Sequence, residues 1–409
     1  MLKVTAAYTS YIAQFMRRNF EIGSKSYAEQ SNLLFRDAFA WADFWKTALS
    51  PFGWEVCEVV ANIKEMQFRW AKERGYKCDS RNWQYEIALQ QIREFEPEVL
   101  FVDGYSLFTV EEIDQIRELC PSIRAIVCWC GAPYSDTSVF LPYDLVLSCV
   151  PEIVSKLRAD GCKSEYLNHA FSYEVLTRIE DVKEKSIPLS FVGQIVPGRQ
   201  QHSKREKLLT AVAHSDVPIE IYTPSYRWSP QEKIKFEVKK VAASAYSKFI
   251  EVGFERRGME KTPFIQKFVK WREETNFCED VALSSCFNPP VFGVEMFKKI
   301  RQSKVVLNCH IDISKRSASN MRLFEVTGTG SCLLTDRKKN LNTLFEPDYE
   351  VVTYSSEEEC IEKARWLLDH PREREEIARA GQRKTLKDHT FENRAIQFIS
   401  IIDQCIKEC

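Results

Sequence analysis

The sequence predicts an α/β protein built from two tandem, doubly wound domains. Its 409 residues exceed the size at which one hydrophobic core usually stops growing. Short, continuous apolar runs alternate with amphipathic helix patterns, which is typical of parallel strands covered by helices on both faces. A charged stretch at 177–188 interrupts this alternation, which then restarts. We therefore expect one domain over 1–183 and a second over 184–390.

The first half contains four helix patterns between its apolar runs. Thr109 and Glu112 have the spacing of a capping box, and another helix has Pro151 at its start and Gly161 at its end. The expected strands are 3–8, 55–60, 98–105, 124–130 and 144–149, and the expected helices are 31–49, 82–95, 109–120 and 151–161.

The second half repeats the alternation with one long interruption. The expected strands are 189–195, 219–224, 304–310, 331–336 and 349–354. Helices are expected from Ser203, from a start near Asn320 capped by Ser319 or Asn320, and after Tyr354. Residues 227–290 break the pattern and are predicted to be a helical insertion. The last helix, 391–409, could pack on either domain, including the first.

The overall charge excludes a general attraction to nucleic acid or to anionic membranes. Lysine plus arginine total 57 and aspartate plus glutamate total 58, a net charge of −1. The one large bias is at 227–272, where twelve basic residues face five acidic ones, a difference of 12 − 5 = +7. Two interpretations stay open: a solvated helical surface, or a surface facing an anionic acceptor or membrane headgroups.

The cysteines and the lack of targeting segments indicate a reducing compartment. The start of the chain lacks the apolar core of a signal peptide, and no apolar run is long enough to span a bilayer. Cys128 and Cys130 stand in an apolar run without a second ligand pair, so we expect them to pack in the core. We predict a cytoplasmic protein, with peripheral contact at the inner face of the membrane if 227–272 binds lipid headgroups.

A conventional dinucleotide site is not expected. That fingerprint requires a strand, then glycines, then a helix, whereas Gly328 and Gly330 follow a helix and precede a strand. The first strand has no glycine. The helix expected to begin near Asn320 offers a diphosphate-binding site instead, because the free backbone amides at a helix N-terminus favour an anion. Glu325 could then accept hydrogen bonds from a ribose, or be a solvent-facing helix residue.

The second half resembles the nucleotide-sugar-binding domain of GT-B glycosyltransferases of the group 1 kind, nearest to their spore-maturation-type branch. The residues that carry this resemblance are SKVVLNCH (303–310), NMRLFEVTGTG (320–330), CLLTD (332–336), LFEPDYEVVTY (344–354) and GQRKTLKDHTFENR (381–394). It implies two Rossmann-like domains with a cleft between them, the first binding the acceptor. It also implies metal-independent sugar transfer, without a cofactor, from a nucleotide-diphosphate donor to a glycan, lipid-linked or protein acceptor, in glycan or surface-polysaccharide biosynthesis.

The resemblance assigns roles to individual residues. Glu325 corresponds to the second glutamate of an E-x7-E motif, which contacts the donor ribose, whereas Ser317 stands where the first glutamate is expected. Because of this departure, the resemblance does not decide whether the anomeric configuration of the sugar is retained or inverted during transfer. The expected donor-binding residues are Glu325, Asn320, Arg322, Gly328, Thr329, Gly330, Arg199, Lys204, Arg205, Gly193, Asn308, Lys315 and Arg316. Arg199, Lys204 and Arg205 would stabilise the departing diphosphate, and Gly328 and Gly330 would let the backbone approach the donor.

Three residues are candidates for catalysis. An inverting enzyme needs a base for the acceptor hydroxyl, and Asp103 and His169 follow strands of the first domain. His310, Lys315 and Arg316 are near enough in sequence to take the place of the absent glutamate. Two other functions stay open: a sugar-nucleotide epimerase, or a non-catalytic nucleotide-sugar-binding protein.

Overall fold

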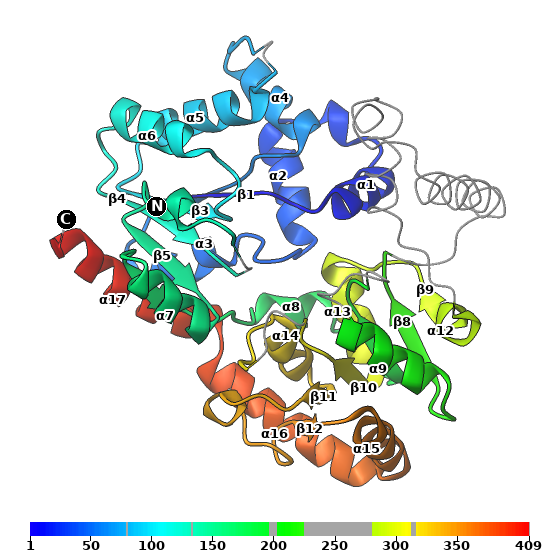
Figure 1. Cartoon of the computed structure of the whole chain (residues 1–409). Coiled ribbons are helices and arrows are strands. Elements are labelled where there is room, and N and C mark those ends of the chain that lie inside the picture. Colours follow the sequence, from blue (N-terminus) through cyan, green and yellow to red (C-terminus); the bar gives the residue numbers. More distant parts are fainter. Residues whose placement is uncertain (79–80, 132–133, 196–202, 225–279, 312–315, 409) are drawn as a thin grey trace, which may run out of the picture.

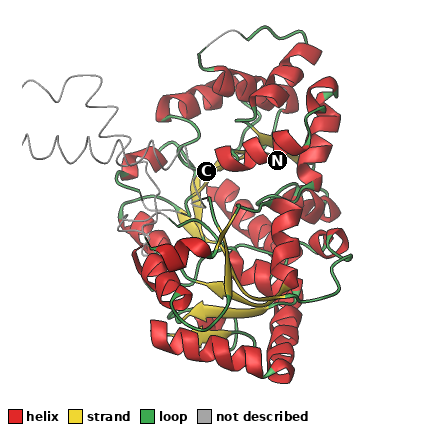
Figure 2. Ribbon diagram, turned by 90° about the vertical axis from the view of Figure 1, so that its right-hand side faces the viewer, coloured by secondary structure: helices red, strands yellow, loops and turns green. Residues whose placement is uncertain are grey.

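The computed structural model consists of two parallel six-stranded sheets, each covered by helices on both faces (Figures 1 and 2). It describes residues 1–78, 81–131, 134–195, 203–224, 280–311 and 316–408. The charged segment 227–272, Arg199 and Lys315 lie outside these residues. Within the described ranges, none of the helices combines the length and the apolar composition that a membrane span requires.

The first sheet has the strand order β2-β1-β3-β4-β5-β6. Its strands are β1 (Leu2–Thr5), β2 (Cys57–Val60), β3 (Val99–Asp103), β4 (Ala125–Trp129), β5 (Leu145–Ser148) and β6 (Ser164–Tyr166). Its helices are α1 (Thr9–Arg18), α2 (Tyr27–Arg36), α3 (Phe44–Leu49), α4 (Lys64–Glu73), α5 (Trp83–Phe95), α6 (Val110–Leu119) and α7 (Pro151–Ala159). The capping box of Thr109 and Glu112 is present at α6, as predicted.

The second sheet has the order β12-β11-β10-β7-β8-β9. Its strands are β7 (Ile187–Val192), β8 (Ile219–Tyr222), β9 (Phe287–Asn288), β10 (Ser303–Asn308), β11 (Cys332–Asp336) and β12 (Val352–Tyr354). The helices that follow α7 are α8 (Glu174–Arg178), α9 (Ser203–Ala213), α12 (Val281–Ser285), α13 (Gly293–Gln302), α14 (Arg322–Thr329), α15 (Glu357–Asp369), α16 (Pro371–Asp388) and α17 (Phe391–Glu408). Both sheets are doubly wound, as the sequence predicts.

Two predicted elements are wrong. The predicted helix 31–49 is broken into α2 and α3, and Ala38, Ala40 and Ala42 between them adopt positive φ. The predicted interruption 227–290 includes α12 and the strand β9, which pairs in parallel with β8. A two-residue strand has too few residues for its alternation to be recognised in a sequence.

The hydrophobic core supports the prediction for the cysteines. Cys128 and Cys130 are fully buried, as expected for thiols that pack in the core. The last helix, α17, packs against α3 and β4 of the first half, and Gln397 donates a hydrogen bond to the Tyr166 carbonyl at 3.1 Å. Figure 1 shows α17 running back alongside the first sheet after α16 leaves the second. The chain therefore ends on the half in which it began.

Candidate functional site

Each sheet has a point at which its strand order reverses, and ligands of open α/β sheets bind at the carboxyl ends of the strands there. In the first sheet this point lies between β1 and β3, where Thr5 is paired with Asp103. In the second it lies between β7 and β10, which end at Val192 and Asn308. The segment 316–320 and α14 follow β10, so they belong to this edge.

Helix α14 places Glu325 at its N-terminal end. Glu325 lies in the first turn, is buried, and accepts a hydrogen bond from Arg322 at 2.7 Å. Burial raises the pKa of Glu325, and the Arg322 guanidinium acts against that shift. The interpretation of Glu325 as a solvent-facing helix residue is therefore wrong.

The predicted cap of this helix is also wrong. Met321 is the N-cap residue, and no side chain caps the helix. The Asn320 amide instead donates to Asn308 Oδ1 at 2.8 Å, and the Ser319 N–H donates to His310 Nε2 at 3.3 Å. An uncapped helix N-terminus retains its tendency to bind an anion.

The C-terminal end of α14 instead packs against neighbouring parts of the protein. A Cβ on Gly328 would lie 2.4 Å from the Phe171 ring, and Gly330 ends the helix in the left-handed conformation with φ of 81°. Thr329 is buried and donates to the Val326 carbonyl. The expectation that these three residues bind the donor is not supported, since an eight-residue helix separates its two ends by about 12 Å.

The basic residues after β7 are also placed differently from the prediction. Arg205 is buried and donates to the Cys309 carbonyl at 2.6 Å and to the Gln194 carbonyl at 2.7 Å. Its guanidinium thus fixes two loops at the strand ends and is committed to the protein. Lys204 is exposed at the start of α9, as is Arg316 beyond β10. Gly193 directly follows β7, and its N–H donates to the Tyr222 carbonyl.

His310 is held by both ring nitrogens. Nδ1 lies 2.7 Å from Asp336 Oδ1, and Nε2 accepts from Ser319, so the network assigns the proton to Nδ1. Burial acts to raise the pKa of Asp336, but His310 and then Lys338 hold it well below its usual range. His310 therefore fixes the segment 316–320 in place and has no nitrogen left for a substrate proton.

The two first-domain candidates are also engaged in the protein. Asp103 accepts from Thr5 at 3.0 Å and lies 3.6 Å from the Lys3 ammonium, which also contacts Glu58. Lys3, Thr5 and Asp103 line a small cavity of about 40 Å³, together with Trp41. Asp103 retains access to that cavity.

The His169 ring packs against Trp41 and Trp129, with ring centroids 5.7 and 5.2 Å apart. Burial, aided by the Arg394 cation, lowers the pKa of His169 to about 3. Its Nδ1 is buried and has no hydrogen-bond partner among the described residues. Such a ring stays neutral and is a poor proton acceptor, because a useful base has a pKa near the working pH.

Sequence reasoning missed two residues at this boundary. Desolvation and the negative charges of Asp103 and Glu325 raise the pKa of Tyr8, so its hydroxyl lies within electrostatic range of one carboxylate from each half. Glu152, in the first turn of α7, accepts a hydrogen bond from Ser317 at 2.9 Å. Both residues follow a strand, β1 and β5, so the rule that selected Asp103 would also have selected them.

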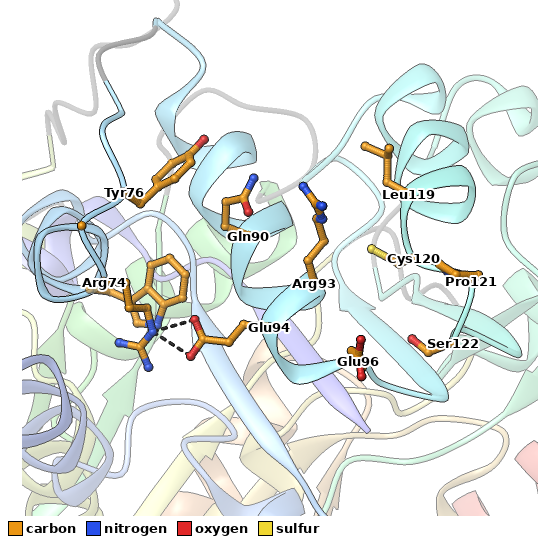
Figure 3. A pocket seen from close by; sticks show the side chains of 12 residues that line it. Arg74, Tyr76, Gln90, Arg93, Glu94, Glu96, Leu119, Cys120, Pro121 and Ser122 are labelled. Carbon is orange, nitrogen blue, oxygen red and sulfur yellow. Dashed lines mark hydrogen bonds and ion pairs between the residues drawn. The ribbon is translucent and has the colours of Figure 1, made fainter.

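Another pocket lies elsewhere among the described residues. It measures about 610 Å³ and is formed by the end of α4, the α5 helix and the turn after α6, with an Arg74–Glu94 ion pair on its wall (Figure 3). The ends of α5 and α6 lead into the amino ends of β3 and β4. This pocket is therefore at the opposite edge of the first sheet from the site described above. No group of three or more potential metal-ligating side chains occurs among the residues with described coordinates.

Comparisons with known proteins identify the architecture. A family described as "Glycosyl transferase-like" matches residues 255–400, whereas no curated protein matches the sequence. HepE of Anabaena, solved in complex with UDP-glucose, has a TM-score of 0.55 at 8% sequence identity. The structural alignment covers 98% of this chain and 99% of the HepE chain. Sucrose-phosphate synthase of Thermosynechococcus elongatus has a TM-score of 0.50 at 10% identity, covering 89% and 92%. The chain has the GT-B fold, as predicted.

Proposed function

We propose that the protein is a glycosyltransferase that moves a sugar from a nucleoside-diphosphate donor to an acceptor hydroxyl. The observation that carries this proposal is the N-terminal end of α14 in a GT-B chain. It presents uncapped amides and the Arg322–Glu325 pair at the edge of the second sheet that meets the first domain. The match of residues 255–400 to the glycosyl transferase-like family supports it independently.

The geometry suggests how the donor would be held. Helix amides and their dipole stabilise a diphosphate, both when it binds and when it departs with negative charge. A carboxylate in the first turn lies beside that position and can accept both hydroxyls of a ribose. The HepE structure contains UDP-glucose, which supports a nucleotide sugar as the donor of this chain. The acceptor would then be bound by the first domain, where Tyr8 and Asp103 face the same boundary.

The full chain incubated with a panel of nucleotide sugars tests this proposal. Transfer to an acceptor, or slow hydrolysis of one donor to its nucleoside diphosphate, is the expected result. Isomerisation of the sugar would indicate an epimerase, and binding without turnover would indicate a non-catalytic protein. Either outcome would overturn the proposal.

The finer assignments stay predictions from the sequence. They are the spore-maturation-type branch, a role in surface-polysaccharide biosynthesis, a cytoplasmic location, metal independence, and contact of 227–272 with anionic headgroups. We propose that 227–272 provides that contact because it combines a charge of +7 with a nearly neutral chain. Co-sedimentation with vesicles of anionic and of neutral lipids tests it, and equal binding to both would contradict it.

A further inference from the structure

The first domain reaches into the segment that precedes α14. Glu152 follows β5 and lies in the first turn of α7, which begins with Pro151. Its carboxylate accepts a hydrogen bond from the Ser317 hydroxyl at 2.9 Å, although 165 positions separate the two residues. Ser317 is only 5% exposed, whereas Glu152 is exposed. A carboxylate of one domain is thus held against a buried residue of the other.

A second contact fixes the same turn. The Cys149 thiol donates to the Ser319 carbonyl at 3.1 Å, and this pair is buried. From the other side, His310 accepts from the Ser319 N–H. The segment 317–319 is therefore bound by side chains of both domains.

The middle of this segment is equally constrained. The Ala318 N–H donates to the Asn340 side chain at 2.6 Å, and the Asn340 amide donates to the Ala318 carbonyl at 3.1 Å. Because the backbone on which Ser317 stands is fixed, its hydroxyl orients Glu152 relative to α14, which begins at Arg322. The distance from Glu152 to the uncapped end of that helix is therefore set by the fold.

Glu152 also has unused bonding capacity. A carboxylate offers about four acceptor positions, and Ser317 occupies one of them. Among the described residues, Glu152 takes part in no ion pair. Its negative charge repels phosphate but accepts hydrogen bonds from hydroxyl groups. A ligand group that suits this position is therefore a neutral polyol rather than a phosphate.

We propose that Glu152, oriented by Ser317, binds hydroxyl groups of the transferred sugar, so that the first domain completes the donor site. This inference rests on the proposed function, in which the diphosphate binds at α14 and the sugar extends toward the acceptor domain. It makes recognition of the sugar, but not of the nucleotide, depend on contact between the domains.

The test compares a nucleotide sugar with the nucleoside diphosphate alone. The probes are UDP-glucose and UDP, or the corresponding pair for whichever donor the panel selects, titrated calorimetrically into the full chain. Glu152→Ala should weaken binding of the nucleotide sugar about tenfold, the loss of one or two hydrogen bonds to a charged group. Binding of the nucleoside diphosphate should change less than about twofold, since no contact to it is lost. Ser317→Ala should have the same selectivity with a smaller effect, and Glu118→Ala, an exposed residue of α6, should affect neither ligand.

A purely structural role for Glu152 would weaken both ligands equally or lower the thermal midpoint of the free protein. Equal weakening, or unchanged binding of the nucleotide sugar, would overturn the inference. Glu152→Gln keeps the side chain's shape and separates a folding defect from a lost contact: it should leave the thermal midpoint unchanged and still weaken the sugar donor selectively. If the parent chain binds no nucleotide sugar, the proposed function itself fails, which is a different result.

Discussion

The two ends of α14 differ in what they do, although both were expected to bind the donor. The N-terminal end carries the Arg322–Glu325 pair, and desolvation, Asp103 and Glu325 together raise the pKa of Tyr8 in the first domain. The C-terminal end is closed by packing, with Gly328 against Phe171 and Gly330 against Gln382. If the N-terminal end binds the donor, as proposed, changes at the two ends of this helix should have opposite signatures: loss of nucleotide binding at one end and loss of stability at the other.

The largest effect is expected from Gly328→Ala. Its Cβ would lie 2.4 to 2.6 Å from three atoms of the Phe171 ring, and Phe171 is itself fixed by backbone hydrogen bonds to His389 and Phe391. We expect a loss of up to about 3 kcal/mol in the free energy of unfolding, measured by urea denaturation. The double variant with Phe171→Ala should restore part of this loss. A Gly328→Ala protein as stable as the parent would contradict the packing role.

Glu325→Ala tests the other end. Loss of a charged hydrogen-bond acceptor should weaken nucleotide binding about ten- to a hundredfold. Titration of the nucleoside diphosphate measures this, and the thermal midpoint shows whether the fold is intact. Glu118→Ala is the matched control. If the variant binds the nucleotide as tightly as the parent, the ribose assignment is wrong and the two ends do not differ as described.

The pH dependence of stability concerns the packed part of the helix, since the His389 ring lies 5.0 Å from Phe324. Burial lowers the pKa of His389 to about 4, from an ordinary 6.5. The unfolded chain therefore binds the proton more tightly, and stability should fall as the pH falls from 6.5 toward 4. The slope contributed by this one group is at most about 1.4 kcal/mol per pH unit.

Urea denaturation across this range checks the prediction. His389→Gln should reduce the slope. Identical slopes in the parent and in His389→Gln would show that the buried ring does not titrate as described.

The smallest effect is expected from Gly330→Ala. A left-handed conformation costs a residue with a Cβ about 1 kcal/mol, and the new atom would lie 3.0 Å from the flexible Gln382 side chain, which can move. Nucleotide binding should be unchanged. A change in binding larger than the change in stability would mean that this end of α14 contributes to recognition after all.

The sequence was sufficient where a pattern repeats locally. Continuous apolar runs such as AIVCW and VLFVD predict buried parallel strands, and both form them. The same alternation predicts the reversal of strand order and so the edge at which the site lies. Glu325 is found at that edge because it lies in the first turn of α14, the helix that follows β10.

The tertiary structure decided what local patterns cannot encode. Residues 31–49 contain no glycine or proline, yet the helix breaks because Asp37 accepts a hydrogen bond from Val294 at 2.7 Å and Phe39 stacks on Tyr11 at 3.8 Å. These contacts, one of which joins residue 37 to residue 294, offset the cost of three alanines at positive φ.

The same distinction applies to the site. The sequence singled out 317–325 in the second domain and Asp103 in the first, but not Glu152. Glu152 reaches Ser317 only because the two domains are packed together, and no spacing within either domain records that contact. The strand order, and with it the edge of the sheet at which the site lies, follows from the periodicity of apolar residues. That periodicity is a property of each segment alone. The partner of a side chain depends on which distant surfaces the fold brings into contact.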